Sequence, residues 1–280
     1  MIAHEFDYVK PATLAEALDL LAEEGAKPLS GGMSLIPMMK LRLAAPTKLV
    51  DLSGIAELRT IERDGPVFQI GAMTTHYEIE SSASIRQHIP LLAQTAAQIG
   101  DVQVRNLGTI GGSVAHNDPA ADYPATLMAM NAIVRTASKR GTKVTKIGDF
   151  FVDALTTSLE PGEIVTGIEV MAKPGEGSCY HKVPHPASGY AVVGIAVRIA
   201  KEDGAIGNAR IGITGLASKA FRATKAEEAL KNGASAADAA ALGAEGVDAS
   251  SDMYASADYR KHLARVHTVR AIAMALAKAQ

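Results

Sequence analysis

Cysteine and tryptophan are scarce in this chain. Among its 280 residues there is a single cysteine, no tryptophan, and only 4% aromatic residues. One thiol, that of Cys179, cannot build an internal disulfide framework, and it cannot supply the thiolates that a structural zinc site or an iron–sulfur cluster needs. Redox chemistry on this chain would therefore depend on a cofactor held without cysteine, and the core must be mainly aliphatic.

The chain also lacks an excess of one charge and a long hydrophobic run. Its 28 Lys and Arg residues nearly balance 30 Asp and Glu residues, for a net charge of −2, which disfavours a nucleic-acid partner. No stretch approaches the roughly 20 apolar residues of a membrane span. The first residues show neither the basic nor the apolar region of a secretion signal. We expect a cytoplasmic protein, and the 48% of apolar residues allow a sizeable core.

Two common nucleotide-binding motifs are absent as well. No G-x-G-x-x-G follows a predicted strand, so the fingerprint of a Rossmann fold is missing. No G-x-x-x-x-G-K-[ST] occurs, which disfavours a Walker-type nucleotidase. Phosphate binding, if this chain performs it, must use another kind of loop.

Hydrophobic periodicity and turn residues predict alternating helices and strands in the first half. Thr13 and Glu16 have the spacing of a capping box, and Gly25 ends the predicted helix. Asp64-Gly65 is typical of a hairpin turn. The predicted strands are 27–29, 48–52, 60–63, 67–70, 132–136 and 163–170, and the predicted helices include 35–41, 89–99 and one that ends near 130.

A proline- and glycine-rich stretch at 172–178 is the best candidate linker. It predicts a first domain over 1–173, with subdomains of about 1–56 and 57–173, and a second domain over 177–280. Strands over 190–199 and 205–216, followed by helices over 224–232, 235–242 and 256–279, predict an α+β architecture for the second domain.

Two glycine clusters carry the strongest functional signal. The first is Ser30-Gly31-Gly32-Met33-Ser34, and the second is Gly108-Thr109-Ile110-Gly111-Gly112-Ser113. Glycine permits positive φ and close backbone approach, and successive free N–H groups in such turns bind anions. Either cluster alone could be an ordinary turn. Together they predict two loops that grip the two phosphates of a pyrophosphate.

These residues resemble the FAD-binding (medium) subunits of molybdenum hydroxylases, in the xanthine dehydrogenase family. The segment 28–37 is similar to the first flavin loop of that family, and 108–113 with Asp118-Pro119 and Asp122-Tyr123-Pro124 is similar to the second. The resemblance runs nearly end to end and is strongest to the carbon monoxide dehydrogenase members. It implies an α+β, vanillyl-alcohol-oxidase (PCMH-type) FAD-binding fold of two α+β subdomains, followed by a C-terminal α+β domain with a small antiparallel sheet and helices.

The resemblance also implies a set of FAD-binding residues. The loops 30–34 and 109–113 would hold the pyrophosphate, and Asp122 would reach the adenosine side. Ile164 and Val165 would pack on the cofactor, Lys182 would lie near the flavin ring, and Tyr190 would cover it. The full set is Leu29, Ser30, Gly31, Gly32, Met33, Ser34, Leu35, Thr109, Ile110, Gly111, Gly112, Ser113, Asp122, Ile164, Val165, Lys182 and Tyr190, with no catalytic residue and no metal ligand.

Several of these residues also have a structural interpretation. Asp122 could cap the following helix, Lys182 could be a solvated charge, and Tyr190 could be ordinary core. The histidines at 116, 181 and 185 have a spacing that fits no standard metal site. The chain departs from the family pattern at Met33 (usually His), at Ser113 (often Asn), in the stretch Pro184-His185-Pro186 and at Gly189.

The function implied by the resemblance is electron transfer through FAD. Partner subunits would carry the rest: a large one the molybdenum-pterin cofactor and a small one the iron–sulfur clusters, in a dimer of heterotrimers that delivers electrons to an external acceptor. The substrate would be carbon monoxide, an N-heterocycle or an aldehyde. The location would be cytoplasmic, with peripheral attachment at the inner face of the membrane left open. Two alternatives stand beside it: a non-enzymatic dinucleotide-binding scaffold or sensor, and a free-standing flavin oxidoreductase.

Overall fold

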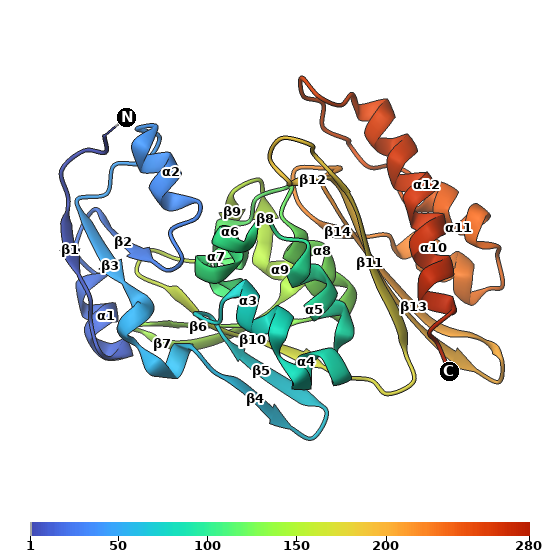
Figure 1. The fold of residues 1–280 in the computed structure, drawn as a ribbon, viewed down its shortest axis with the longest axis horizontal. Coiled ribbons are helices and arrows are strands. Elements are labelled where there is room, and N and C mark those ends of the chain that lie inside the picture. Colours follow the sequence, from blue (N-terminus) through green and yellow to red (C-terminus); the bar gives the residue numbers. More distant parts are fainter. Residues whose placement is uncertain (1) are drawn as a thin grey trace.

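The computed structural model describes residues 2–280, which form three parts side by side (Figure 1). The order of the parts in space follows the order of the chain, with the first segment at one end and the last helices at the other. Each of the three large sheets is built from strands of a single segment of the chain. The fold is α+β, as predicted.

The first part is a three-stranded parallel sheet in the order β1-β3-β2. Thr13 caps the first helix by accepting a hydrogen bond from the backbone N–H of Glu16, whereas the Glu16 carboxylate turns back to the N–H of Ala12. The helix ends at Leu20, before the predicted end at Gly25, and Gly25, with φ of 77°, lies in the turn that leads into β2. The elements are β1 (Asp7–Val9), α1 (Leu14–Leu20), β2 (Ala26–Leu29), α2 (Leu35–Lys40), β3 (Lys48–Asp51) and the 3-10 turns η1 (Leu52–Gly54) and η2 (Ala56–Leu58).

The second part is a five-stranded antiparallel sheet in the order β4-β5-β10-β6-β7, covered by helices. The predicted hairpin is confirmed as β4 and β5, whereas β7 was not predicted because this edge strand is almost entirely exposed and carries no apolar alternation. Its elements are β4 (Ile61–Asp64), β5 (Val67–Gly71), α3 (His76–Ser81), α4 (Ala83–His88), α5 (Pro90–Ala97), α6 (Val102–Leu107), α7 (Ile110–His116), α8 (Asp122–Met130), β6 (Ile133–Ser138), β7 (Gly141–Lys146), α9 (Ile147–Phe150), β8 (Phe151–Asp153), β9 (Thr156–Thr157) and β10 (Ile164–Met171).

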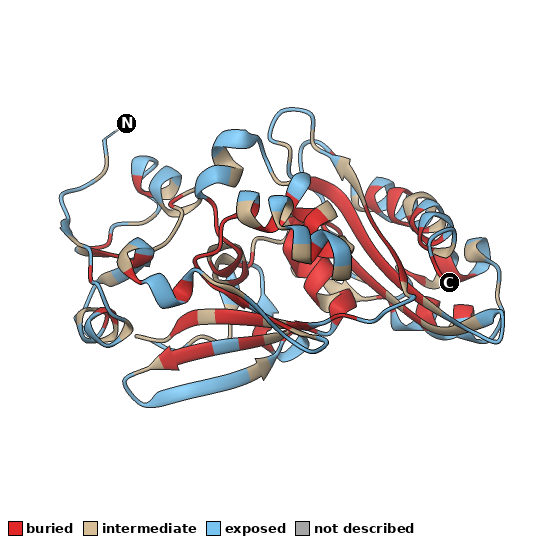
Figure 2. Cartoon of the chain, turned by 60° about the horizontal axis from the view of Figure 1, so that its bottom comes forward, coloured by how far each residue is buried: buried red, intermediate tan, exposed pale blue. Residues whose placement is uncertain are grey.

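The third part is a four-stranded antiparallel sheet in the order β11-β12-β13-β14. One face packs on α8 of the second part and the other on α10 and α12, so the strands are buried on both sides (Figure 2). β11 was not predicted, and it begins inside the stretch assigned to the linker. Its elements are β11 (Gly177–Pro184), β12 (Ala191–Glu202), β13 (Ala205–Thr214), β14 (Phe221–Arg222), α10 (Thr224–Lys231), α11 (Ala236–Leu242) and α12 (Ala257–Leu276).

Buried side chains continue across the junction between the second and third parts. Tyr180 of β11 and Ala196 of β12 belong to the hydrophobic core of the second part. Tyr180 is 3% exposed and lies against the region where α8 begins, because its hydroxyl reaches Asp122. The third part therefore supplies side chains to the interior of its neighbour, which matters for the site described next.

Candidate functional site: a pocket between the three parts

A cavity of about 1160 Å³ runs along the junction of the three parts. One end lies against the C-terminal end of α1 and the turn between β6 and β7. The middle lies against the two glycine loops, and the other end reaches the loop that contains Tyr190. The elongated arrangement brings together most of the residues that the sequence singled out.

The first glycine loop offers free backbone donors. Ser30–Ser34 connects β2 to α2, and Gly32 adopts φ of 71°, a conformation that favours glycine. Within residues 2–280, the backbone N–H groups of Gly31, Gly32, Met33 and Ser34 have no acceptor in the protein. All four residues line the cavity. A run of unpaired N–H groups facing a cavity is suited to the oxygens of a phosphate.

The second glycine loop differs, because its N–H groups are already used. Ile110 and Gly111 donate to the carbonyls of Thr74 and Ala72, at 3.0 and 2.9 Å. Gly112 donates to the Thr109 hydroxyl, which caps α7, and Ser113 donates to the Thr109 carbonyl. The expectation that both loops present free N–H groups is therefore wrong for this loop from residue 110 onward. It can offer hydroxyls instead.

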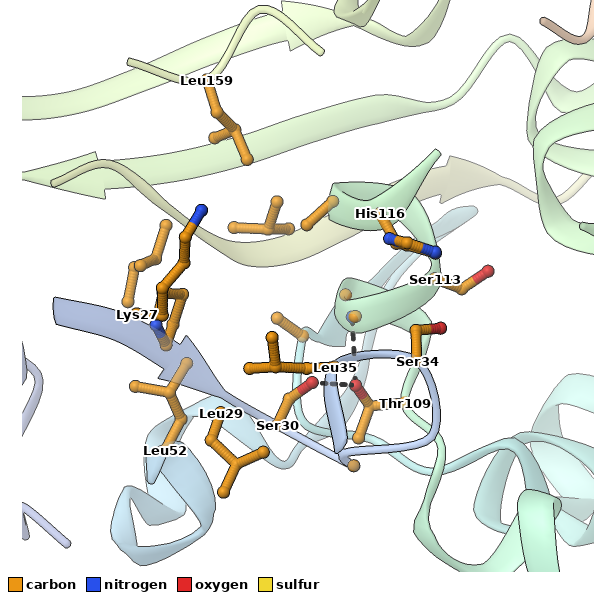
Figure 3. A pocket seen from close by; sticks show the side chains of 18 of the residues that line it. Lys27, Leu29, Ser30, Ser34, Leu35, Leu52, Thr109, Ser113, His116 and Leu159 are labelled. Atoms are coloured by element: carbon orange, nitrogen blue, oxygen red, sulfur yellow. Dashed lines mark hydrogen bonds between the residues drawn. The ribbon is translucent and has the colours of Figure 1, made fainter. Parts of the chain in front are cut away.

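The two loops touch each other directly. The Thr109 hydroxyl donates to the Ser30 hydroxyl at 3.3 Å, and Figure 3 shows these side chains pointing toward one another. A Cβ atom on Gly31 would lie 2.1 Å from the Leu107 carbonyl oxygen, and one on Gly112 would lie 2.6 Å from the Ser30 hydroxyl oxygen. These glycines are thus required for the approach of one loop to the other.

Ile110 is the one predicted loop residue that does not line the cavity. Its side chain is fully buried in the hydrophobic core of the second part, where Val114 from the next turn of α7 is also buried. Helical periodicity turns this position of α7 inward, so Ile110 could reach a cofactor only through its backbone, and its place in the predicted set stays a prediction.

Apolar side chains form much of the cavity wall. Leu29 and Leu35 flank the first loop (Figure 3), and Ile164 and Val165 of β10 also line the cavity. The far end has charged residues that sequence reasoning missed, namely Lys27, Lys139, Arg140 and Glu160. Their spacing in the sequence carries no motif, so only the fold could bring them together.

Asp122 forms a buried ion pair with Lys182. The Asp122 carboxylate accepts hydrogen bonds from Lys182 Nζ at 2.8 Å and from the Tyr180 hydroxyl at 2.5 Å. The two charged side chains are only 5% and 3% exposed. Burial raises the pKa of Asp122 to about 6, and the Lys182 charge opposes that rise. Asp122 is the first residue of α8 and makes no cap, so the cap interpretation is wrong.

This ion pair connects two predicted positions. Asp122 was expected at the adenosine side and Lys182 near the flavin ring, yet the two side chains are in contact, so only one of these placements can hold for an extended dinucleotide. Asp122 lines the cavity, whereas Lys182 lies behind it. The Lys182 ammonium donates hydrogen bonds to Asp122 and to the Gln98 carbonyl. The interpretation of Lys182 as a solvated surface charge is also wrong.

Tyr190 stands at the rim of the cavity. It is 43% exposed and lies just before β12, so it is not a core residue. Burial raises the pKa of the Tyr190 phenol, the carboxylates of Asp118 and Asp122 raise it further, and the Ser34 hydroxyl lowers it. Tyr190 and Asp122 therefore share one end of the cavity, close to the end of the first glycine loop.

His76 is a cavity residue that the sequence did not single out. It is 5% exposed, packs edge-on against Tyr123 with ring centroids 5.3 Å apart, and its Nδ1 atom has no hydrogen-bond partner. Burial, with a smaller contribution from the Arg105 charge, lowers the pKa of His76 to about 4. The neutral imidazole of His76 thus packs against Gly108 and supports the second glycine loop.

The other histidines are scattered. His116 lines the cavity, His181 pairs with His267 on α12 through ring nitrogens 2.8 Å apart, and His185 bonds within its own loop. Within residues 2–280, no three His, Cys, Asp or Glu side chains are grouped so that they could hold a metal ion. In the same range, no helix is both long and apolar enough to cross a membrane.

Two family models together match almost the whole chain. Residues 4–171 match the FAD binding domain in molybdopterin dehydrogenase, and residues 178–275 match the CO dehydrogenase flavoprotein C-terminal domain. The chain therefore belongs to the family of FAD-binding medium subunits of molybdenum hydroxylases, and it is the flavoprotein component of a molybdenum-dependent oxidoreductase. The resemblance predicted from the sequence is confirmed.

Individual relatives cover several substrates. The chain is 37% identical to the carbon monoxide dehydrogenase medium chain of Afipia carboxidovorans, over the full length of both, and 35% identical to the glyceraldehyde dehydrogenase medium chain of Sulfolobus acidocaldarius, covering 97% of this chain and 98% of the relative. Carbon monoxide dehydrogenase from Hydrogenophaga pseudoflava has the same fold, with a TM-score of 0.96, 37% identity and full coverage of both chains. Quinoline 2-oxidoreductase from Pseudomonas putida matches with a TM-score of 0.93 and 31% identity, covering 98% of each chain.

The cavity has the features that FAD requires. It is long, its middle presents four unpaired N–H groups beside two loop hydroxyls, and its walls are largely aliphatic. The donors suit a diphosphate and the apolar walls suit flat rings. The predicted vanillyl-alcohol-oxidase type of fold agrees with the FAD-binding model matched by the chain.

Proposed function

We propose that this chain is the electron-transfer subunit of a heterotrimeric molybdenum hydroxylase. A large partner would carry the molybdenum-pterin cofactor and a small partner the iron–sulfur clusters, and two such trimers would associate. Similarity over the full length to medium chains of multi-subunit enzymes supports this assignment. The single, buried Cys179 agrees with it, because this chain cannot hold clusters itself.

The observation that carries the proposal is the row of unpaired N–H groups at Gly31–Ser34 in the middle of a long cavity. These donors would hold the pyrophosphate of FAD together with the hydroxyls of Ser30 and Ser113. Thr109 would act by fixing Ser30 and the first turn of α7. When bound, FAD would supply the redox chemistry, taking electrons from the partner's clusters and passing them to an external acceptor.

The remaining cavity residues orient the cofactor and exclude water. Leu29, Leu35, Ile164 and Val165 present apolar surface, which fixes the plane of a ring without hydrogen bonds. Tyr190 covers the rim at the end where Asp122 lies. We assign that end to the flavin and the end near Lys27 and Arg140 to the adenosine. The protein thus supplies binding, orientation and electrostatics rather than a general acid or base.

The substrate we propose is carbon monoxide, with N-heterocycles and aldehydes as the other candidates. The identities to carbon monoxide, glyceraldehyde and nicotine enzyme subunits are 37%, 35% and 35%, which do not separate the three classes. The residues that contact substrate would lie in the large partner. We propose a cytoplasmic location for the complex, with the inner face of the membrane as its other candidate site.

The test is purification of the native complex followed by mass, metal and flavin counts. We expect one FAD for each copy of this chain, with molybdenum and iron on the partners, and bleaching of the flavin absorption within turnover time after rapid mixing with carbon monoxide, quinoline or an aldehyde. A colourless chain that rejects added FAD would contradict the proposal. A bound flavin that stays oxidised during turnover would favour a sensor, and activity of the chain alone would favour a free-standing oxidoreductase.

A further inference from the structure

The loop that carries Tyr190 is closed by its own hydrogen bonds. It joins β11 to β12 over residues 185–190 and lines the cavity through Ser188, Gly189 and Tyr190. Gly189 adopts φ of 72°. At its base, the N–H of His185 donates to the Tyr190 carbonyl at 2.7 Å, which closes the turn. The next residue after the loop, Ala191, donates to the Ala120 carbonyl of the second part.

His185 supplies most of the acceptors in this loop. The N–H groups of Ala187 and Ser188 donate to its ring Nδ1 atom at 3.2 and 3.3 Å, and the N–H of Gly189 donates to its carbonyl at 2.9 Å. The N–H of Tyr190 donates to the Ser188 hydroxyl at 3.4 Å, and Pro186 has no N–H. Every backbone donor from 185 to 190 is therefore paired, and three of the five pairs end on His185.

The geometry also fixes the form of the ring. A backbone N–H can only donate, so Nδ1 must carry a lone pair and the ring proton must sit on Nε2. The ring packs against Tyr254 from the segment before α12, with centroids 4.4 Å apart and an angle of 61° between the planes. Pro186 restricts His185 to extended backbone conformations. Tyr254 thus holds the His185 ring from outside the loop, and Pro186 restrains the His185 backbone from within it.

From these contacts we propose that His185 is a positioning residue for Tyr190. Its imidazole replaces the missing backbone acceptors of the loop, and the closed loop keeps the Tyr190 ring at the rim of the cavity beside Ser34. Tyr254 braces the imidazole. This inference rests on the proposed function only in assigning that end of the cavity to the flavin. The closure of the loop by His185 does not depend on that assignment.

The test compares His185→Ala, His185→Asn and Tyr190→Ala in the full chain loaded with FAD, with His262→Ala on the exposed side of α12 as the matched control. The probe is iodide quenching of flavin fluorescence. Losing the two ring hydrogen bonds should raise the quenching constant about two- to fivefold in His185→Ala, toward that of Tyr190→Ala. FAD content should stay unchanged in His185→Ala. Asn should restore the wild-type value, because its carboxamide oxygen accepts from N–H groups two and three residues on.

Hydrogen exchange over 185–191, followed by mass spectrometry, is the second readout. We expect faster exchange in His185→Ala, and wild-type exchange in His185→Asn and His262→Ala. Quenching and exchange that are identical in wild type and His185→Ala would overturn the inference, and so would an Asn variant that behaves like Ala. A chain that takes up no FAD would instead contradict the proposed function, while the exchange data would still test the closure of the loop.

Discussion

At the residue scale, Asp122 and Lys182 form a buried ion pair beside the cavity. It links β11 of the third part to α8 of the second, and its carboxylate lines the cavity. Tyr180 from the same strand adds a third hydrogen-bonding group to the pair. A buried carboxylate is tolerated when paired and strongly unfavourable when its partner is removed.

We expect Lys182→Met to lower the free energy of unfolding by about 3–5 kcal/mol at pH 7.5, because it leaves Asp122 buried without a cation. Adding Asp122→Asn should recover part of that loss. The control is Lys139→Met, which removes an exposed pair with Asp19 and should cost at most about 1 kcal/mol. Urea denaturation of the four proteins measures the difference, and equal losses for the two lysines would contradict the assignment.

His76 predicts a specific pH dependence. Its pKa is about 4 in the folded state and 6.5 when unperturbed, so between these values the unfolded state binds the additional proton. Stability from this residue is therefore present above pH 6.5 and is lost as the pH falls toward 4, by up to about 3 kcal/mol. We expect wild type to lose this much more than His76→Asn between pH 7 and pH 4 in urea titrations. Parallel curves would contradict the buried, neutral state.

At the element scale, the two glycine loops have different duties. The first presents unpaired N–H groups to the cavity, whereas the second spends most of its N–H groups on the 72–74 segment and on its own cap. The second loop thus fixes α7 against the 72–74 segment, and its glycines permit that contact. Because of this division, replacing a glycine should have a different effect in each loop. In the first loop it would disturb the unpaired N–H groups, and in the second it would disturb the packing of α7.

Gly111→Ala tests the element-level packing. The added Cβ would lie 2.4 Å from the Ala72 Cβ and 2.7 Å from the Ala72 carbonyl oxygen, so α7 must shift. We expect a loss of about 1–3 kcal/mol in unfolding free energy and lower FAD content. Gly148→Ala is the control, since its Cβ would meet only the Met128 Cε at 3.9 Å, and it should be neutral or stabilising by up to about 1 kcal/mol. Similar effects at both positions would contradict this packing.

At the scale of the whole molecule, the cavity exists only because three parts meet. α8 lies between the central sheet and the C-terminal sheet, and it contributes Asp122 to the cavity and a packing face to β12 and β13 (Figure 1). The third part contributes Tyr190 to the rim of the cavity and Lys182, the cation that pairs with Asp122. Displacing the third part should therefore disturb the end of the cavity at Tyr190 and Asp122, which we assign to the flavin, before it disturbs the middle at the first glycine loop.

Gly212 on β13 is the position at which this docking can be tested. A Cβ there would lie 1.9 Å from the Ala125 carbonyl oxygen of α8, and backbone on both sides leaves no flexible side chain to give way. We expect Gly212→Ala to destabilise the protein by about 1–3 kcal/mol and to increase iodide access to the flavin. Ala205→Val, at the exposed start of the same strand, should stay within about 0.5 kcal/mol. Unchanged flavin access in Gly212→Ala would show that the docking of the third part on α8 does not shape the site.

The sequence by itself determined the local elements and the class of protein. A capped helix at Thr13, a hairpin turn and two glycine clusters act over a few residues, so their signals are contained in the residues themselves. The turn lies at Gly65-Pro66, one residue later than predicted. The end-to-end similarity to FAD-binding medium subunits followed from those clusters and their order. Elements whose residues carry no local pattern, such as the edge strands β7 and β11, were missed.

Only the tertiary structure decided which groups are free and which are paired. Asp122 and Lys182 are 60 positions apart, and no local rule indicates that they meet. The N–H groups of the second glycine loop are consumed by a segment more than thirty residues away in the chain, while those of the first are left unpaired. Pairing of this kind depends on how distant segments come together, and this determines what each predicted residue can do.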